Sequence, residues 1–274
     1  MRRATTRTAC GLVAALSLAF ATLPALAQET AARIDGADTA WMMAATALVL
    51  MMTIPGLALF YCGMVRKKNV LATMAQSVAC TALCSLLWFA IGYSLSFIGD
   101  APWLGTFERL FLRGIGMEST SAFAPTIPEL LYVVYQMGFA IFTVALIAGA
   151  VADRMRFSAF LWFAAGWLIF VYVPIAHWVW GGGFLASAGA LDFAGGTVVQ
   201  LNAGIAGLIA AYVLGKRNGY GNDNFAPTTC RWRSSAWACC GSAGSALPAG
   251  RRSAPMHARR SRSPPRILPP RRAR

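Results

Sequence analysis

Charged residues are scarce in this sequence, and histidine is scarcer still. Only 12% of the 274 residues are charged, whereas soluble domains carry about 25%. The two histidines, His177 and His257, are too few for a histidine-rich metal site. The apolar segments hold no paired carboxylates, so general acid–base catalysis lacks its usual side chains. These absences argue against a soluble protein, an enzyme and a resident metal, and we expect no cofactor.

Two further absences exclude a disulfide scaffold and a nucleotide site. Cys62, Cys80 and Cys84 fall in apolar segments, where buried free thiols are predicted. The triple glycine Gly181–Gly183 has neither the preceding strand nor the lysine–threonine pair of a phosphate-binding loop. These glycines are better suited to an unusual turn or to a close backbone approach.

Acidic residues are missing from the C-terminal end, and this explains the net charge of +14. Eleven arginines and no acidic residue follow Phe225. The residues up to Phe225 contain thirteen basic and ten acidic residues. The body of the protein therefore has a charge of only +3. The basicity does not predict a nucleic-acid-binding domain, and we expect no specific nucleic-acid partner.

What the sequence has in abundance is long apolar runs, since 57% of its residues are hydrophobic. A bilayer core of about 30 Å requires roughly 20 helical residues. Five charge-free stretches reach that length: Thr39–Val65, Val70–Ile98, Leu130–Ala152, Phe157–Leu191 and Phe193–Gly215. The predicted fold class is an all-α polytopic membrane protein in which five transmembrane helices cross the lipid bilayer.

The fourth stretch is too long for one simple span. Pro174 and the sequence Trp180–Gly183 predict a helix that ends near Val173 and is followed by a re-entrant or surface segment.

The N-terminus resembles a targeting segment. Arg2, Arg3 and Arg7 precede an apolar run over 10–23, and small residues at 25–27 offer a cleavage site before Gln28. This pattern predicts a signal peptide over residues 1–27. An additional, uncleaved helix is the alternative.

Basic loops predict the orientation of the helices. Arg66–Lys68 follows the first stretch, Asp153–Arg156 the third, and Lys216–Arg217 the fifth. Because basic loops stay on the cytoplasmic side, the mature N-terminus is predicted outside the cell inner (plasma) membrane. An outside N-terminus also agrees with a cleaved signal peptide.

Three aromatic residues are candidates for binding a cation. Tyr135 and Phe139 are four residues apart, so they share one face of the third span. Trp180 lies on the outer side of the fourth stretch. An aromatic face attracts a cation by about 0.5–1 kcal/mol when exposed, and by more when desolvated. The alternative is the belt of interfacial aromatic residues that anchors membrane helices.

Three polar residues lie in or beside the fifth stretch. Asp192 precedes it, where its carboxylate either attracts a cation or, as we favour, caps the helix. Gln200 and Asn202 lie within it and need partners, so they are predicted to face a neighbouring helix or a pore. These residues together favour a channel or transporter for a small solute.

Four motifs sharpen this interpretation: "DTAWMMAATALVLMMTIPGLALFYCGMVRKKNVL", "AHWVWGGG", "GALDFAGGTVVQLNAGIAGL" and "LGKRNGYG". They resemble the ammonium transporter (Amt/MEP/Rh) family from Asp38 to Pro227, most weakly in the loop Gly99–Pro128. The resemblance implies a homotrimer with a narrow hydrophobic pore through each subunit. Its core would consist of two five-helix halves in inverted orientation. A PII-type signal protein docks on the cytoplasmic face in that family.

The resemblance also implies roles for individual residues. Trp180 and Tyr135 match the outer vestibule that selects ammonium, and Phe139 matches a gate phenylalanine. Asp192 matches the family's structural aspartate. Gln200 stands where typical members have the first of two pore histidines ("GGTVVHIN"), and a glutamine cannot take up a proton as an imidazole does.

Only the first of the two halves is present among the predicted spans. We therefore expect a partial transporter domain over residues 28–227 and a disordered tail rich in Arg, Ser and Pro over 228–274. Thr228–Ala246 can be encoded by DNA whose shifted frame reads "NLPMAVIGVGMLWVGWFG", which resembles the family's sixth helix. This predicts a frameshifted tail. The alternative is a genuine cytoplasmic tail that binds anionic lipids or RNA nonspecifically, and the coding DNA distinguishes the two.

Three functions follow from the sequence. The first is transmembrane transport of ammonium or ammonia by family resemblance, in a chain expected to be truncated and nonconducting. The second is a nonconducting membrane interaction module that joins or poisons intact trimers. The third, which we favour least, is a different transporter that uses Gln200.

Overall fold

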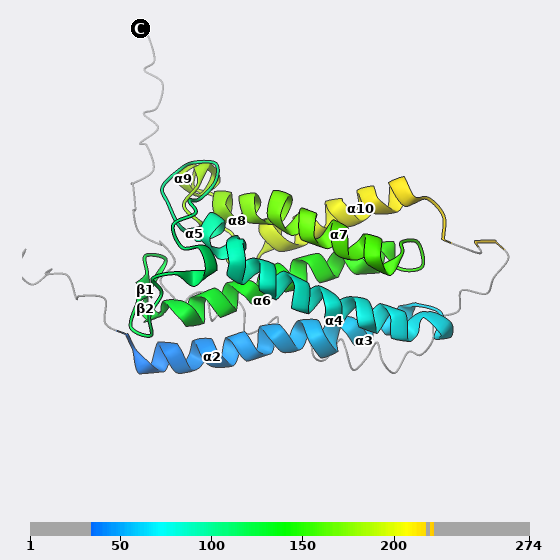
Figure 1. Cartoon of the computed structure of the whole chain (residues 1–274), viewed down its shortest axis with the longest axis horizontal. Coiled ribbons are helices and arrows are strands. Elements are labelled where there is room, and N and C mark those ends of the chain that lie inside the picture. The colour runs from blue at the N-terminus through cyan, green and yellow to red at the C-terminus, as the bar shows by residue number, and fades with distance from the viewer. Residues whose placement is uncertain (1–33, 218–219, 222–274) are drawn as a thin grey trace, which may run out of the picture. The chain divides into compact units, whose positions relative to one another are not determined.

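The computed structural model describes residues 34–217, 220 and 221 (Figure 1). The predicted signal peptide (1–27) and tail (228–274) lie outside these residues. In the described part, five helical segments are long and apolar enough to cross a membrane: Gly36–Met64, Lys67–Phe97, Glu129–Val151, Phe157–Ser187 and Gly196–Leu214. They confirm the five predicted spans and the all-α class.

Most of these segments are built from more than one helical element. The first contains α2 (Gly36–Met51), η2 (Met52–Leu57) and α3 (Ala58–Met64), and the second contains η3 (Lys67–Asn69), α4 (Val70–Leu87), η4 (Trp88–Gly92) and α5 (Tyr93–Phe97). The third is α6 alone (Glu129–Val151). The fourth contains α7 (Phe157–Trp167), η6 (Leu168–Tyr172), α8 (Val173–Trp180) and α9 (Phe184–Ser187), and the fifth contains η7 (Gly196–Leu201) and α10 (Asn202–Leu214).

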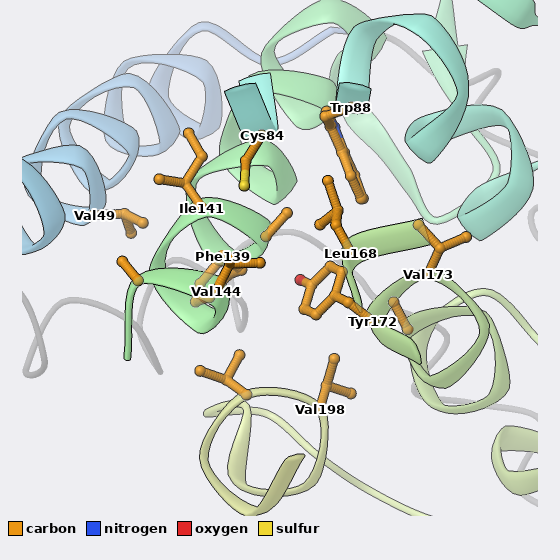
Figure 2. Close-up of a cluster of buried hydrophobic side chains, with 14 of the residues drawn as sticks. Val49, Cys84, Trp88, Phe139, Ile141, Val144, Leu168, Tyr172, Val173 and Val198 are labelled. Atoms are coloured by element: carbon orange, nitrogen blue, oxygen red, sulfur yellow. The ribbon is translucent and has the colours of Figure 1, made fainter. Parts of the chain in front are cut away.

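Helix α6 is the centre of the bundle. It packs against α2, α4, α7 and α10, which surround it in Figure 1. Its most apolar window is 72% buried, against 22% for the segment Gly196–Leu214. Gly138 allows α2 to approach closely, because a Cβ there would lie 2.7 Å from a methyl carbon of Val49. Figure 2 shows the resulting core, where Phe139 and Val144 of α6 meet side chains from the other spans.

Four of the five spans contain a π-helical turn, and two of these turns lie at a proline. Pro55 lies inside η2, and Pro174 is the second residue of α8, directly after η6. Proline has no N–H to donate and its ring clashes with the preceding turn. A widened π-helical turn accommodates both effects without ending the helix.

The prediction of a helix end near Val173 is therefore wrong. The fourth span continues through η6 and α8 as far as Trp180, and the short helix α9 follows the glycines. Pro174 lies inside this continuous helical segment, directly after η6, and the π-helical turn accommodates its missing N–H. Local sequence alone does not reveal a π-helical turn upstream of it.

The loop 99–128 closes one end of the bundle. It contains η5 (Leu110–Leu112) and an antiparallel hairpin of β1 (Thr120–Ser121) and β2 (Ala124–Pro128), in which Thr120 pairs with Pro128. Helix α6 begins directly after β2, and the N–H of Glu129 donates to the carbonyl of Ser119 at 2.7 Å. The loop is therefore held at the N-terminal end of the central helix.

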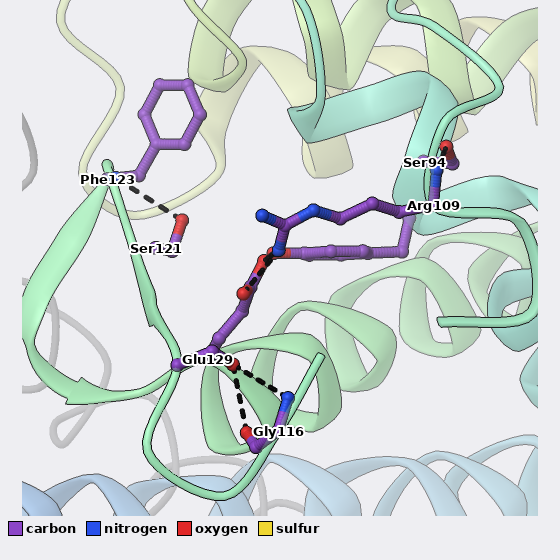
Figure 3. Close-up of polar contacts among 8 residues, drawn as sticks. Ser94, Arg109, Gly116, Ser121, Phe123 and Glu129 are labelled. Atoms are coloured by element: carbon purple, nitrogen blue, oxygen red, sulfur yellow. Dashed lines mark hydrogen bonds and ion pairs between the residues drawn. The ribbon is translucent and has the colours of Figure 1, made fainter. Parts of the chain in front are cut away.

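A buried carboxylate ties this loop to two spans (Figure 3). Glu129 is 1% exposed, and its Oε1 accepts a hydrogen bond of 2.8 Å from the hydroxyl of Tyr93. The guanidinium of Arg109 donates to both carboxylate oxygens, at 2.6 and 2.5 Å. The backbone N–H of Arg109 also donates to Ser94 Oγ at 3.1 Å. A buried carboxylate is tolerated only when paired in this way.

The opposite end is joined by a second polar cluster. Asp153, in the turn after α6, accepts a hydrogen bond from the side-chain amide of Asn69, and its other oxygen lies 3.7 Å from Nε of Arg66. This cluster connects the loop after α3 with the turn after α6. The predicted buried thiols are confirmed, since Cys62, Cys80 and Cys84 are free and buried.

Candidate functional site

Three aromatic side chains meet near the end of the bundle that carries loop 99–128. Tyr135 and Phe139 stack edge to face on α6, with ring centroids 5.0 Å apart. Phe139 makes a similar contact with Trp180 of α8 at 5.8 Å. Their exposed fractions are 0%, 2% and 6%, so all three rings are buried. The structure thus brings together the three aromatic residues that the sequence singled out from separate spans.

Trp180 is held in place by a hydrogen bond of its side chain and by tight packing of the residue that follows it. It is the last residue of α8, and its indole N–H donates to the backbone carbonyl of Asp192 at 2.8 Å. The following residue, Gly181, is required by packing, because a Cβ there would lie 2.0 Å from the carbonyl oxygen of Ser96. The ring therefore has little freedom to turn away from Phe139.

The same helix is anchored by a buried imidazole. The two ring nitrogens of His177 lie 3.0 Å and 2.7 Å from the carbonyl oxygens of Ser96 and Ala101. These contacts fix α8 against the end of α5 and the start of loop 99–128. No local sequence pattern predicts this role for His177, because the two carbonyl groups that it contacts lie 76 and 81 residues away in the chain.

Asp192 caps the fifth span. Its carboxylate accepts hydrogen bonds from the backbone N–H groups of Gly196, Thr197 and Val198, at 2.7, 2.8 and 3.1 Å. These are the first N–H groups of η7, which have no acceptor within the helix. Gly195, at φ +78°, turns the chain into the helix. This is the geometry of a helix cap, here provided from three residues before the formal cap position.

Asp192 also links the helix start to the aromatic site. Its backbone carbonyl holds the indole of Trp180, while its side chain holds the first turn of η7. A change in this residue would therefore alter both the position of the ring and the start of the span.

Gln200 and Asn202 have different surroundings, although both lie in the fifth span. Asn202 is 9% exposed, and its side-chain amide donates to the carbonyl of Val198 at 3.3 Å. Gln200 is exposed. Within the described part of the chain, no hydrogen bond or ring contact joins the side chain of Gln200 to Tyr135, Phe139 or Trp180. Asn202 thus faces protein as predicted, whereas the described residues leave Gln200 uncovered.

The remaining side chains of the described region offer no metal centre. No group of three or more His, Cys, Asp or Glu side chains gathers there in a way that could hold an ion. The polar residues that sequence reasoning missed are Tyr93, Arg109 and Glu129. A single acid at the start of an apolar span, after a loop with mixed charges, was the signal that could have found them.

A family model described as the Ammonium Transporter Family matches residues 40–241, well over half of the chain. This chain belongs to the ammonium transporter family. The match runs beyond Pro227, where the resemblance described from the sequence ends. With its five apolar helical segments, this member of the family is a multi-pass membrane protein.

Individual family members are similar in sequence and in structure. The ammonium transporter of Aquifex aeolicus is 49% identical over 194 residues, which are 70% of this chain and 45% of that protein. The ammonium transporter of Bacillus subtilis is 49% identical over 180 residues, 66% of this chain and 44% of that protein. The crystal structure of Candida albicans Mep2 superposes with a TM-score of 0.72 at 34% identity, covering 81% of this chain and 49% of Mep2. The chain thus spans about half the length of the family members it matches.

Proposed function

We propose that this chain provides one half of an ammonium transport pathway across the membrane, with Tyr135, Phe139 and Trp180 at its outer entrance. The convergence of the three rings carries the proposal, because the family resemblance gives these positions to the vestibule and the gate. A small cation over desolvated rings gains about 2 kcal/mol or more. The printed names of the relatives, which are ammonium transporters, support ammonium as the solute.

Each residue has a distinct part in this proposal. Trp180 and Tyr135 attract and select the cation, and Phe139 closes the pore below them. Asp192 is structural, because its carboxylate orders the start of η7 and its carbonyl holds Trp180. Gln200 occupies the first pore-histidine position, where an amide cannot relay a proton near neutral pH. Homotrimer formation and docking of a PII-type signal protein belong to the same family-based proposal.

Substitution of Trp180 tests whether the three aromatic residues form the entrance of the pathway. We would join residues 34–221 to the C-terminal half of the Bacillus subtilis ammonium transporter, include Gln200→His, and measure ammonium-driven current in liposomes. Trp180→Leu should raise the half-saturating ammonium concentration roughly fivefold to thirtyfold, as expected for a loss of about 1–2 kcal/mol of cation–aromatic attraction.

Trp162→Leu is the matched control, since Trp162 lies on α7 with 82% of its surface exposed and outside the aromatic cluster. It should leave the half-saturating concentration unchanged. Equal effects of the two substitutions would contradict the proposed entrance.

We further propose that the protein lies in the cell inner (plasma) membrane with its mature N-terminus outside. The basic loop Arg66–Lys68 would then be cytoplasmic and loop 99–128 external. In a background without other cysteines, Glu118→Cys should react with a membrane-impermeant maleimide in intact cells. Lys67→Cys should react only after the cells are opened. Both positions are exposed, so labelling of Lys67→Cys from outside would reverse the topology.

A further inference from the structure

The imidazole of His177 is a buried titratable group that the proposed transport pathway does not use. His177 lies on α8, three residues before Trp180, and is 0% exposed. Its Nδ1 lies 3.0 Å from the carbonyl oxygen of Ser96, and its Nε2 lies 2.7 Å from the carbonyl oxygen of Ala101. Both distances are those of hydrogen bonds. Each ring nitrogen therefore faces a hydrogen-bond acceptor.

Two carbonyl acceptors require two N–H donors from the one ring. A neutral imidazole has one N–H and one lone pair, whereas an imidazolium has two N–H groups. In either neutral tautomer, the lone pair of one nitrogen would point at a carbonyl oxygen at hydrogen-bond distance. That contact would be repulsive, and it would leave two buried acceptors facing each other without a proton between them. The two contacts together therefore favour the doubly protonated ring.

The ends of two helices give a second reason for a positive charge at this place. His177 lies in the last turn of α8. Ser96 lies one residue before the end of α5, where the membrane-length segment Lys67–Phe97 also ends. The C-terminal end of a helix carries a partial negative charge, because its last carbonyl groups have no N–H partner within the helix. Two such ends converge on one imidazole, and both stabilise its charged form.

Within the described part of the chain, no charged side chain forms an ion pair with His177. Helices α5 and α9 and the turns η6 and η7 pack against α8, and their titratable side chains are the phenols of Tyr93 and Tyr172. In the adjoining segments, the carboxylate of Asp192 caps η7, and Arg109 pairs with Glu129. The other charged side chains of loop 99–128 are exposed: Asp100, Glu108, Arg113 and Glu118. Backbone carbonyl groups are thus the partners of the ring.

The glycines after α8 keep the space that this arrangement needs. A Cβ at Gly181 would lie 2.0 Å from the carbonyl oxygen of Ser96 and 2.8 Å from Nδ1 of His177. Any side chain at this position would therefore separate the imidazole from its acceptor. The N–H of Gly183 donates to the backbone carbonyl of His177 at 3.1 Å, so the turn also folds back onto the same residue.

We propose that His177 is a buried imidazolium that clamps loop 99–128 and the end of α5 to α8 in a proton-dependent way. Its Nδ1–H donates to the carbonyl of Ser96, and its Nε2–H donates to the carbonyl of Ala101. Loss of either proton removes one hydrogen bond and turns a lone pair towards a carbonyl oxygen. Because the folded chain then holds a proton that the unfolded chain releases, the clamp is strongest at low pH and weakens as the pH rises. The inference is independent of whether the chain conducts ammonium.

Nitrogen NMR tests the protonation of the ring directly. The sequence has only two histidines, so His257→Gln leaves His177 as the one imidazole of the 274-residue chain. This variant would be labelled with isotopic histidine, purified without a histidine tag, and measured in detergent at about pH 7.5, where a free imidazole is mostly neutral. Both ring nitrogens should carry a directly bonded hydrogen. A ring nitrogen without a bonded hydrogen would overturn the proposal.

A pH profile separates a proton-dependent clamp from a merely structural contact. His177→Gln replaces the ring by an amide, which takes up no proton and has one donor nitrogen for two separate carbonyl groups. It should lower the midpoint of thermal unfolding by roughly 4–10 °C at about pH 6, and by less than half of that at about pH 9.

His257→Gln is the matched control for this profile, because it removes the other histidine of the chain. It should leave the midpoint unchanged at both pH values. Equal losses from His177→Gln at the two pH values would count against a proton-dependent clamp. The NMR measurement needs no change at His177, so it decides the protonation state even if His177→Gln does not fold.

Discussion

Reconstituted into liposomes, the 274-residue chain by itself should carry no ammonium current above that of empty vesicles. A pore needs walls on every side, and among the residues that the structure describes the fifth span lacks them on one side. Its large side chains are uncovered, with Leu201 57%, Leu208 72% and Tyr212 88% exposed. Gln200 lies on the same uncovered helix, and a polar side chain facing lipid is costly.

Association of several copies should not repair this defect. The family resemblance implies two halves with opposite orientations in the membrane. The basic loops Arg66–Lys68 and Lys216–Arg217 are predicted to hold every copy in the same orientation. We therefore do not expect a second copy to take the place of the inverted half.

The comparison protein is the fusion with the C-terminal half of the Bacillus subtilis transporter, prepared in the same liposomes. The fusion protein that keeps Gln200 should carry a reduced ammonium current. The Gln200→His substitution should restore the current, because an imidazole titrates near neutral pH and an amide does not. A current through the 274-residue chain alone that disappears on Phe139→Ala would contradict the prediction. Equal currents in the fusion with and without Gln200→His would show that the imidazole is dispensable.

The second large effect is expected at the buried carboxylate. Glu129→Gln should lower the free energy of unfolding by about 2–4 kcal/mol, because it removes the charge that pairs with Arg109 while Tyr93 stays in place. We expect less than the full value for a buried pair, because the side chain of Arg109 is 35% exposed and partly screened by water. Thermal unfolding of the detergent-solubilised protein, followed by tryptophan fluorescence, measures the change.

Two further variants show whether the ion pair itself is responsible. Glu118→Gln removes an exposed acid from the same loop and should have little effect. Arg109→Gln combined with Glu129→Gln should be less destabilising than the sum of the single changes, because the two side chains interact directly. Additive losses would mean that the pair contributes nothing beyond its separate side chains.

The sequence by itself determined the five spans and the candidate residues within them. A span is recognised from local composition, because roughly twenty uncharged residues in succession satisfy the bilayer whatever their neighbours are. The quoted motifs between Asp38 and Gly221 likewise indicated the family, which the family model confirms, whereas the roles of Tyr135, Phe139 and Trp180 stay predictions. These properties are local, so they can be read in order along the chain.

Only the tertiary structure decided which span is central and which side chains meet. The segments Gly36–Met64, Glu129–Val151 and Phe157–Ser187 share a mean hydropathy of 2.0, yet their most apolar windows are 44%, 72% and 39% buried. Composition therefore could not single out α6. The contacts of Phe139 with Trp180 and of Arg109 with Glu129 depend on how separate helices pack. Such contacts join residues far apart in the chain, and packing, unlike hydropathy, leaves no local pattern in the sequence.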